Sequence, residues 1–196
     1  MTSEFIDFFS QFDFLMEEDI EDLLTVTEFK QFPKGGLISE ANNIDMNYYL
    51  VVKGIVDQYV LTSNGEFRSF HFAPEGTMIG SLESIQFRKP SRITNEALED
   101  CLIAVMDSEE TESLMNTNPN LRLLENSFLK KSLYDLYDRV IFFTSLTPKE
   151  RYIHIIENQP ELLQRVPQKY IASYVGVSQV SLSRIKSRVE NSLLFY

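Results

Sequence analysis

The feature that most constrains the fold is a regular series of glycine turns in the first half of the chain. Gly54, Gly65 and Gly76 are eleven residues apart, and short β-prone runs separate them. Successive antiparallel strands joined by tight turns have a spacing of about 8–12 residues. The pair Asn64-Gly65 also predicts a hairpin with a type I′ turn, because both residues tolerate positive φ. The region therefore predicts a roll or sandwich of about seven or eight short strands, which the apolar run at 101–106 completes.

Helical patterns flank this β-rich region. Apolar residues among many acids at 4–29 suit short amphipathic helices. Beyond Asp107 the glycines thin out, and Pro119 fits the first turn of a longer helix. Its apolar stripe has intervals of four, three, four and three, and consists of Leu129, Leu133, Leu136, Val140 and Phe143. This near-heptad stripe predicts either a dimer seam, which we favour because the helix joins two expected domains, or packing on the sheet of the same chain.

The segment after this helix predicts a new domain that contains a helix-turn-helix. Thr147-Pro148-Lys149-Glu150 is a capping box, in which Thr147 caps the helix and Glu150 binds the cap amide in return. Further along, Gly176 supplies the left-handed backbone that ends one helix, and Ser178 caps the next. The second of these helices is expected to bury a stripe made of Leu182, Ile185 and Val189.

The remaining positions of this motif are candidates for contact with nucleic acid. Arg184 is expected to read a base edge, while Lys169 and Arg188 are better placed for phosphates. Gln179 and Ser181 could read an adjacent base, whereas Val180 could only touch a thymine methyl group. The expected DNA-binding residues are Lys169, Ser178, Gln179, Val180, Ser181, Arg184 and Arg188.

The distribution of charge agrees with a nucleic-acid module at the C-terminal end. The whole chain has a formal net charge of -11, which by itself argues against a polyanionic partner. Residues 144–196, however, contain seven basic and four acidic residues, a net +3. The rest contains eleven basic and twenty-five acidic residues, a net -14. Such an asymmetry is typical of a tethered nucleic-acid module.

The chain resembles the Crp/Fnr family of bacterial transcription regulators over nearly its whole length. The segment 166–188 is similar to the family's helix-turn-helix, with Ile171-Ala172 and Ser183-Arg184-Ile185 matching especially well. The run 48–54 is similar to a strand and turn of the cyclic-nucleotide-binding fold, and 97–100 and 150–152 resemble one branch of the family. The resemblance implies a sensor β-roll, a long dimer helix and a DNA reader whose second helix enters the major groove.

The resemblance does not identify an effector. Cyclic-nucleotide binders of this fold use a Gly-Glu pair for the ribose and an Arg-Ser pair for the phosphate. Here a serine replaces the first acid, and the second pair is reversed, so we expect cyclic AMP not to bind tightly. The effector-pocket candidates are Gly80, Ser81, Glu83, Ser91 and Arg92. The alternative interpretation is that Arg88, Lys89 and Arg92 form a solvated loop.

Several classes of protein are not expected. His71 and His154 lie in different expected domains, so neither a cupin-type metal site nor an enzyme is expected; we interpret His71 as a sheet residue and His154 as a helix-face residue. Cys101 is the one cysteine, so a disulfide or an iron–sulfur cluster is not expected, and we interpret it as a small buried hydrophobe. Neither a signal peptide nor a membrane span is visible, so the expected location is the cytoplasm.

Together these patterns predict an α+β protein. Its N-terminal antiparallel β-roll is a double-stranded β-helix like that of cyclic-nucleotide-binding domains, and its C-terminal domain is winged-helix-like. The expected boundaries are 1–118 for the β-roll with its N-terminal helices, 119–146 for the dimer helix and 147–196 for the helix-turn-helix domain. The expected function is a dimeric regulator that binds double-stranded DNA at an inverted repeat, with a small-molecule effector and RNA polymerase as further candidate partners. The alternative is a ligand-binding or protein-interaction module whose helix-turn-helix does not bind DNA.

Overall fold

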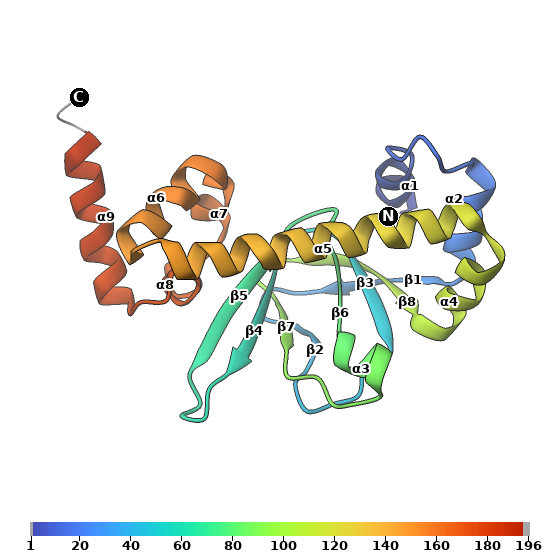
Figure 1. Ribbon diagram of the computed structural model, residues 1–196, viewed down its shortest axis with the longest axis horizontal. Coiled ribbons are helices and arrows are strands. Elements are labelled where there is room, and N and C mark those ends of the chain that lie inside the picture. The colour runs from blue at the N-terminus through green and yellow to red at the C-terminus, as the bar shows by residue number, and fades with distance from the viewer. Residues whose placement is uncertain (1, 194–196) are drawn as a thin grey trace.

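The computed structural model describes residues 2–193 and contains an antiparallel β-roll between two groups of helices (Figure 1). Met1 and residues 194–196, which the expected domain boundaries include, lie outside the described residues. A short helix, α3 (Leu82–Phe87), interrupts the strands between β6 and β7. The strands are β1 (Thr27–Phe32), β2 (Leu37–Ser39), β3 (Asn47–Lys53), β4 (Val56–Leu61), β5 (Phe67–Ala73), β6 (Met78–Gly80), β7 (Thr94–Ala97) and β8 (Cys101–Asp107).

The roll consists of two four-stranded sheets. Their strand orders are β1-β8-β3-β6 and β2-β7-β4-β5, and every neighbouring pair is antiparallel. Small and branched side chains such as Val51, Val56, Ala73 and Ile103 fill the space between the sheets. Cys101 lies among them as a free, buried thiol, as the sequence predicts, and burial raises its pKa to about 11. Strand β5 is at the edge of its sheet, so one side of its backbone has no strand partner.

The hairpin predicted at Asn64-Gly65 is present and joins β4 to β5, but its predicted turn type is wrong. Gly65 has a φ of 77°, whereas Asn64 is not among the residues with positive φ, which a type I′ turn requires. The Gly65 amide donates to the Thr62 carbonyl at 2.9 Å, and the Thr62 amide donates to the Glu66 carbonyl at 2.8 Å. This is the longer hairpin connection in which a type I turn precedes one left-handed glycine.

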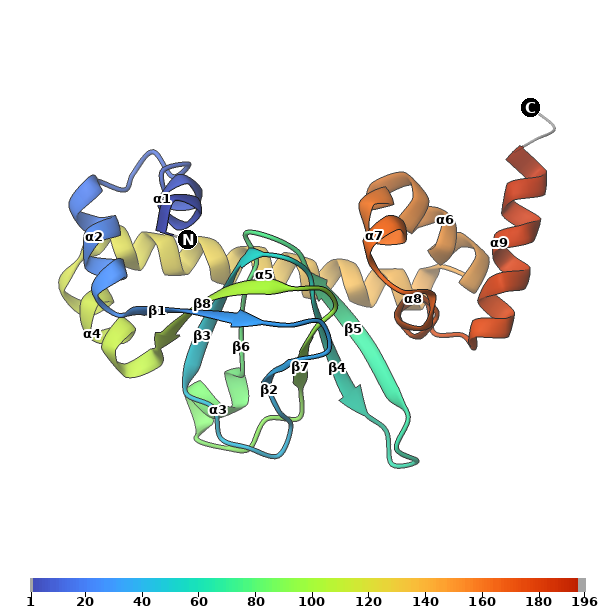
Figure 2. The same cartoon turned by 180° about the vertical axis from the view of Figure 1, so that it is seen from behind.

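The longest helix, α5 (Pro119–Ser145), crosses the roll and has other helices at both of its ends (Figures 1 and 2). Asn118 caps it by accepting the amides of Asn120 and Leu121, and Pro119 occupies its first turn as predicted. Three helices lie near its beginning: α1 (Thr2–Phe9), α2 (Glu17–Thr25) and α4 (Ser108–Thr117). The buried Asp19 of α2 accepts the side-chain amides of Asn118 and Asn120 at 2.6 and 2.9 Å, which fixes α2 to the start of α5.

The apolar stripe on α5 faces away from the rest of the chain. Leu121, Leu124 and Phe142 are the buried residues of α5. In contrast, the side chain of Leu133 is 68% exposed, and all other members of the stripe are also exposed. These exposed members are Leu129, Leu136, Val140 and Phe143, with Tyr134, Tyr137 and Ile141 beside them. Packing of the stripe on the sheet of the same chain, the alternative that the sequence left open, is therefore wrong.

Four helices follow α5 and share a hydrophobic core. They are α6 (Pro148–Asn158), α7 (Pro160–Arg165), α8 (Gln168–Val175) and α9 (Gln179–Leu193), here called the C-terminal helices. The predicted capping box is present, since the Thr147 hydroxyl accepts the Glu150 amide while the Glu150 carboxylate accepts the Thr147 amide. Among the described residues, no helix is both long and apolar enough to cross a membrane. The predicted antiparallel β-roll followed by helices is confirmed. Among residues 2–193, however, no strand follows β8, so the strands of a wing, which a winged-helix-like domain would have, are absent there.

The packing of α1 generates a test of stability. Phe9 is fully buried and its ring contacts those of Phe5, Phe12 and Phe128, whereas Ile6 on the same helix is 39% exposed. We expect Phe9→Ala to lower the free energy of unfolding by about 3–5 kcal/mol, because it leaves a cavity in the aromatic cluster. The control Ile6→Ala should cost under about 1 kcal/mol. Chemical denaturation followed by circular dichroism measures both, and equal losses would contradict this role of Phe9.

Candidate nucleic-acid interface

Helices α8 and α9 form a helix-turn-helix whose turn is built as the sequence predicts. Gly176 ends α8 with a φ of 82°, and its amide and that of Val177 both donate to the Ala172 carbonyl. The Ser178 hydroxyl then accepts the Ser181 amide at 3.2 Å at the start of α9. The shared core includes Ala172 of α8 and Leu182 of α9. The geometry therefore fixes α9 rigidly on α8.

The candidate DNA-binding residues on α9 lie on its exposed side. Leu182 and Val189 are buried and Ile185 is half-buried, which leaves the opposite face for solvent. Val180 is 63% exposed, so an apolar side chain stands among the polar ones. The other candidates on the exposed side are Ser178, Gln179, Arg184 and Arg188, with Ser181 half-buried. The exposed face can thus approach a groove without unfolding the core.

The electrostatics of α9 favour an anionic partner. Arg184, Lys186 and Arg188 follow one another at alternate positions, and Glu190 is the only acidic residue of the helix. Glu190 lies 3.8 Å from the Lys186 ammonium, a partly exposed pair that contributes little to stability. Lys169, the candidate phosphate contact on α8, has its ammonium 4.3 Å from the Tyr170 ring centroid and 5.9 Å from that of Phe67. The cations are therefore on the surface, but Lys169 is beside the β-roll.

Arg151 ties the C-terminal helices to the end of α5. Its guanidinium donates to the carbonyls of Phe143, Leu146 and Val175 at 3.0, 3.1 and 2.9 Å. These carbonyls lie at the ends of α5 and α8, where helix carbonyls lack partners within the helix. Sequence reasoning noted Arg151 only as part of a resemblance. Its role could not be read from the sequence because the three carbonyls come from distant positions.

The effector-pocket candidates are brought together around α3, where Glu83 and Arg92 bind each other and the two serines bind backbone groups. Arg92 donates to Glu83 through both its side chain and its backbone amide. The Ser81 hydroxyl caps α3 by accepting the Ser84 amide, and the buried Ser91 hydroxyl donates to the Ile93 carbonyl. Gly80 is in close contact with the Asn47 carbonyl, which a Cβ atom would approach to 3.2 Å. A nucleotide phosphate needs a free cation here, whereas Arg92 is 84% exposed and paired. These residues do not fit a cyclic nucleotide.

A chain of polar side chains crosses the second sheet. His71 Nδ1 lies 3.0 Å from Gln58 Oε1, Gln58 donates to Asn95 at 2.9 Å, and Asn95 donates to Ser39 at 2.6 Å. The chain links β5, β4, β7 and β2 in their order in the sheet. Burial lowers the pKa of His71 to about 4, because the charged imidazolium would lose its hydration. Each of these four side chains thus has a hydrogen-bond partner within the sheet.

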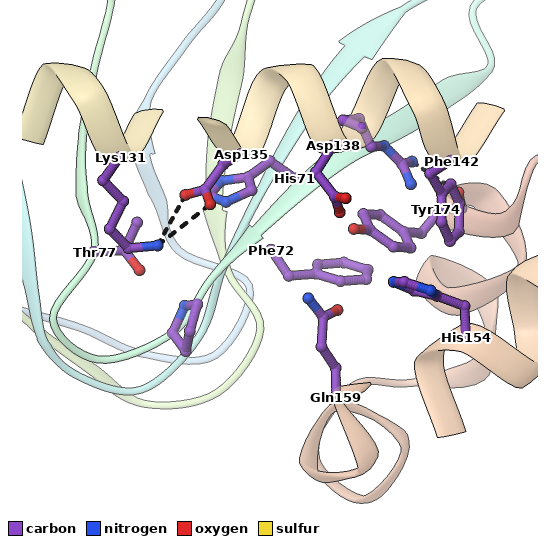
Figure 3. Close-up of a pocket in the computed structure, with 12 residues that line it drawn as sticks. His71, Phe72, Thr77, Lys131, Asp135, Asp138, Phe142, His154, Gln159 and Tyr174 are labelled. Carbon is purple, nitrogen blue, oxygen red and sulfur yellow. Dashed lines mark hydrogen bonds and ion pairs between the residues drawn. The ribbon is translucent and has the colours of Figure 1, made fainter. Parts of the chain in front are cut away.

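A small cavity of about 150 Å³ lies between the β-roll and the C-terminal helices (Figure 3). The aromatic rings of Phe72, Phe142 and Tyr174 contribute to its wall, together with His71 and His154. His71 is a strand residue and His154 a helix residue, as the sequence predicts. They come from distant parts of the chain, yet both line this one cavity. Among residues 2–193, however, no three side chains of the metal-binding types are grouped closely enough to hold a metal ion.

Comparison with known proteins gives one family match and many similar folds. Residues 29–118 match the family described as cyclic nucleotide-binding domain. FixK2 from Bradyrhizobium japonicum is 21% identical with a TM-score of 0.71, covering 85% of this chain and 86% of that chain. The c-di-GMP responsive global regulator CLP of Xanthomonas campestris is 16% identical with a TM-score of 0.75, covering 90% and 93%. A protein from Eubacterium rectale, described as a transcriptional regulator of the Crp/Fnr family, is 15% identical with a TM-score of 0.70, covering 95% and 88%. No curated protein sequence matches the chain.

These similarities show the fold. Two of these solved structures are described as regulators. The likeness to Crp/Fnr regulators that the sequence suggests is confirmed at the level of the fold. None of these comparisons tests the individual residues of α9 or of the α3 region.

The pairing of Glu83 with Arg92 leads to a prediction about cyclic AMP. We expect titration calorimetry to show binding weaker than micromolar, because the cation that a phosphate would need is already neutralised. The variant Arg92→Ala should give the same weak heat as the wild-type chain. Micromolar or tighter binding of cyclic AMP that Arg92→Ala abolishes would contradict this prediction.

Proposed function

We propose that this chain, whose fold is that of the Crp/Fnr transcription regulators, is a DNA-binding transcription regulator that acts as a dimer in the cytoplasm. The observation that carries the proposal is helix α9, which Ser178 caps and whose exposed face carries Arg184 and Arg188. No acidic residue precedes Glu190 in this helix. In this proposal residues 1–118 form the sensor, 119–146 the dimer helix and 147–196 the DNA reader. A small-molecule effector and RNA polymerase are further candidate partners.

Helix α9 has the properties of a recognition helix. Its polar face can enter the major groove, while α8 crosses the DNA backbone. Arg184 is the candidate for base reading, since a guanidinium matches the O6 and N7 acceptors of guanine together. Gln179 and Ser181 are candidates for an adjacent base. Lys169 and Arg188 are candidates for phosphates, which fix the position of the protein without reading sequence.

The exposed stripe on α5 supports a two-fold dimer. A row of large apolar side chains over three or more helical turns is costly in water, and a second copy of the same helix would bury it. A two-fold axis would then present two copies of α9, about 34–36 Å apart, to successive major grooves. The proposed operator is therefore an inverted repeat.

A module that no longer binds DNA is the second candidate. The observations that favour it are the exposed apolar Val180 in the middle of the polar face and the net charge of -11. Gel-shift titration with DNA from upstream of the chain's own gene, at low and at moderate salt, separates the two candidates. Binding at low salt that fades as salt rises supports the regulator, and no shift at low salt supports the alternative.

The dimer seam predicts the effect of charge on α5. We expect Leu133→Glu with Leu136→Glu to produce monomers, because like charges would face each other across the two-fold axis. The control Lys130→Glu lies about 100° round the helix from Leu129 and should stay dimeric. Sedimentation velocity measures both variants. A dimer that survives the two leucine substitutions would contradict the assignment.

The division between reading and anchoring predicts different losses for two cations. Arg184→Ala should weaken the cognate site by roughly 1–3 kcal/mol per lost base contact and affect random DNA far less. Lys169→Ala should weaken both DNAs alike and reduce the salt slope by about one unit per lost phosphate contact in each subunit. Arg68→Ala, on the β-roll, is the control. Equal losses on both DNAs for Arg184→Ala would show that Arg184 anchors and does not read.

A further inference from the structure

The first helix of the helix-turn-helix is docked on the β-roll of its own chain. Six of the eight residues of α8 are buried, including Ser173 and Tyr174. A helix that packs on one side only would leave more of its residues exposed, so α8 is covered on more than one side. The Ser173 hydroxyl accepts the Ser69 amide at 2.9 Å and donates to the Phe67 carbonyl at 3.2 Å. The rings of Phe72 and Tyr174 stack at 4.7 Å. The side chain of Ser173 thus replaces the missing neighbour of the edge strand β5.

Carboxylates of the β-roll bind Arg165 and Tyr170 of the C-terminal helices beside this contact. Arg165 at the end of α7 binds Glu75 at 2.5 and 3.0 Å and also binds Glu99. Tyr170 donates to Glu96 at 2.7 Å. Burial is the largest influence on Glu75 and opposes its ionisation, but the hydrogen bonds from Arg165 and from backbone amides, together with the charge of Arg165, hold the pKa of Glu75 below its ordinary value. The pair of Glu75 with Arg165 therefore persists at mildly acidic pH.

One carboxyl group beneath α8 is not matched in this way. Asp57 on β4 is fully buried; its Oδ2 atom accepts the Ser69 hydroxyl at 2.8 Å, while its Oδ1 atom has no partner among the described residues. The other groups that face it are Glu96 from β7, Lys169 from α8 and Arg139 from α5. Burial raises its pKa to about 7, and the Ser69 bond, which works against this, is the next largest influence.

We propose that the docking of α8 on β5 is a latch, in which Glu75 and Glu99 of the β-roll compete with DNA phosphates for Arg165 and the ionisation of Asp57 loosens the contact. The part that concerns DNA rests on the proposed function. Lys169 and Arg165 lie at or next to the start of α8, where the first helix meets the DNA backbone. While Glu75 and Glu99 occupy Arg165 and the acidic roll lies against α8, phosphates must displace them.

The sign of the pH dependence follows from Asp57. In the docked state the pKa of Asp57 is about 7, above its ordinary value of 3.8. In the proposed undocked state solvent reaches the carboxyl group, and its pKa returns towards the ordinary value. At Asp57 the docked state therefore binds more protons, so this group weakens docking as pH rises towards 7, whereas the lowered pKa of Glu75 acts in the opposite direction at more acidic pH. Above pH 7 both states are ionised and the effect levels off. From pH 5 to 7 the docking equilibrium should fall by roughly tenfold or more.

Hydrogen exchange at one amide reports on the latch directly. The Ser69 amide lies on the free edge of β5 and donates to the Ser173 hydroxyl. Its protection from hydrogen exchange therefore measures the docking of α8. We expect the double variant Glu75→Gln with Glu99→Gln to speed its exchange by about tenfold. Glutamine at 75 can still accept the Gly54 amide that Glu75 now accepts at 2.9 Å. An unchanged protection factor would overturn the latch.

The same variant tests the competition with DNA. The matched control is Glu112→Gln with Glu125→Gln, because these two substitutions remove the same amount of negative charge. The two glutamates bind Arg122 near the start of α5. With a random-sequence duplex at low salt, the latch variant should bind several-fold more tightly than this control. Equal affinities would mean that only long-range charge matters, which overturns the competition. Faster Ser69 exchange with no DNA binding by any chain would support the latch and overturn the proposed function.

Asp57→Asn tests the pH dependence. In the wild-type chain the protection factor of the Ser69 amide should fall between pH 5 and 7, and in Asp57→Asn it should stay constant. Asp45→Asn, which alters a carboxylate far from α8 that accepts the Tyr49 hydroxyl, should keep the wild-type behaviour. Circular dichroism confirms that each variant is folded. A wild-type protection factor that is flat or rises with pH would overturn the role of Asp57.

Discussion

The free edge of strand β5 is the constraint on which the arrangement of the molecule depends. An edge strand presents N–H and C=O groups that must find partners or remain in water. Here Ser173 binds the amide of Ser69 and the carbonyl of Phe67, while Arg139 of α5 donates to the Ser69 carbonyl at 3.3 Å. Two helices therefore cover the edge with side chains, where a barrel would have used another strand.

Arg139 joins the three parts of the chain at this edge. Besides Ser69, its guanidinium donates to the Tyr174 carbonyl at 2.7 Å and lies 3.5 Å from the centre of the Tyr174 ring. Burial lowers its pKa to about 10, and its Nε and Nη1 atoms have no recorded partner among the described residues. Ring faces therefore add to the stabilisation of its charge by the two carbonyls, including the ring of Phe143 at 4.3 Å. Contacts of this kind hold the helices by stacking and tolerate small rotations.

The sequence predicted best those features that depend on neighbouring residues. The capping box at Thr147, the left-handed Gly176 and the cap by Ser178 are each set within four residues, and all are present. The type I′ turn at Asn64 was wrong because a G1-type connection uses the same dipeptide with a different loop length. The pairing of Glu83 with Arg92, and the meeting of the two histidines at one cavity, depend on the fold of distant segments. No local pattern could have predicted them.

The uneven distribution of charge has a second consequence that the sequence alone does not show. A net +3 at 144–196 and a net -14 elsewhere are typical of a tethered nucleic-acid module, but the same charges attract each other within one chain. The structure contains this attraction as contacts of Arg165 with Glu75 and Glu99. Because these pairs are partly shielded from solvent, salt weakens them less than it weakens binding to an open polyanion. A polyanionic partner of the C-terminal helices must therefore displace the carboxylates of the β-roll from Arg165. The acidity of the β-roll thus affects when such a partner can bind, as well as the solubility of the chain.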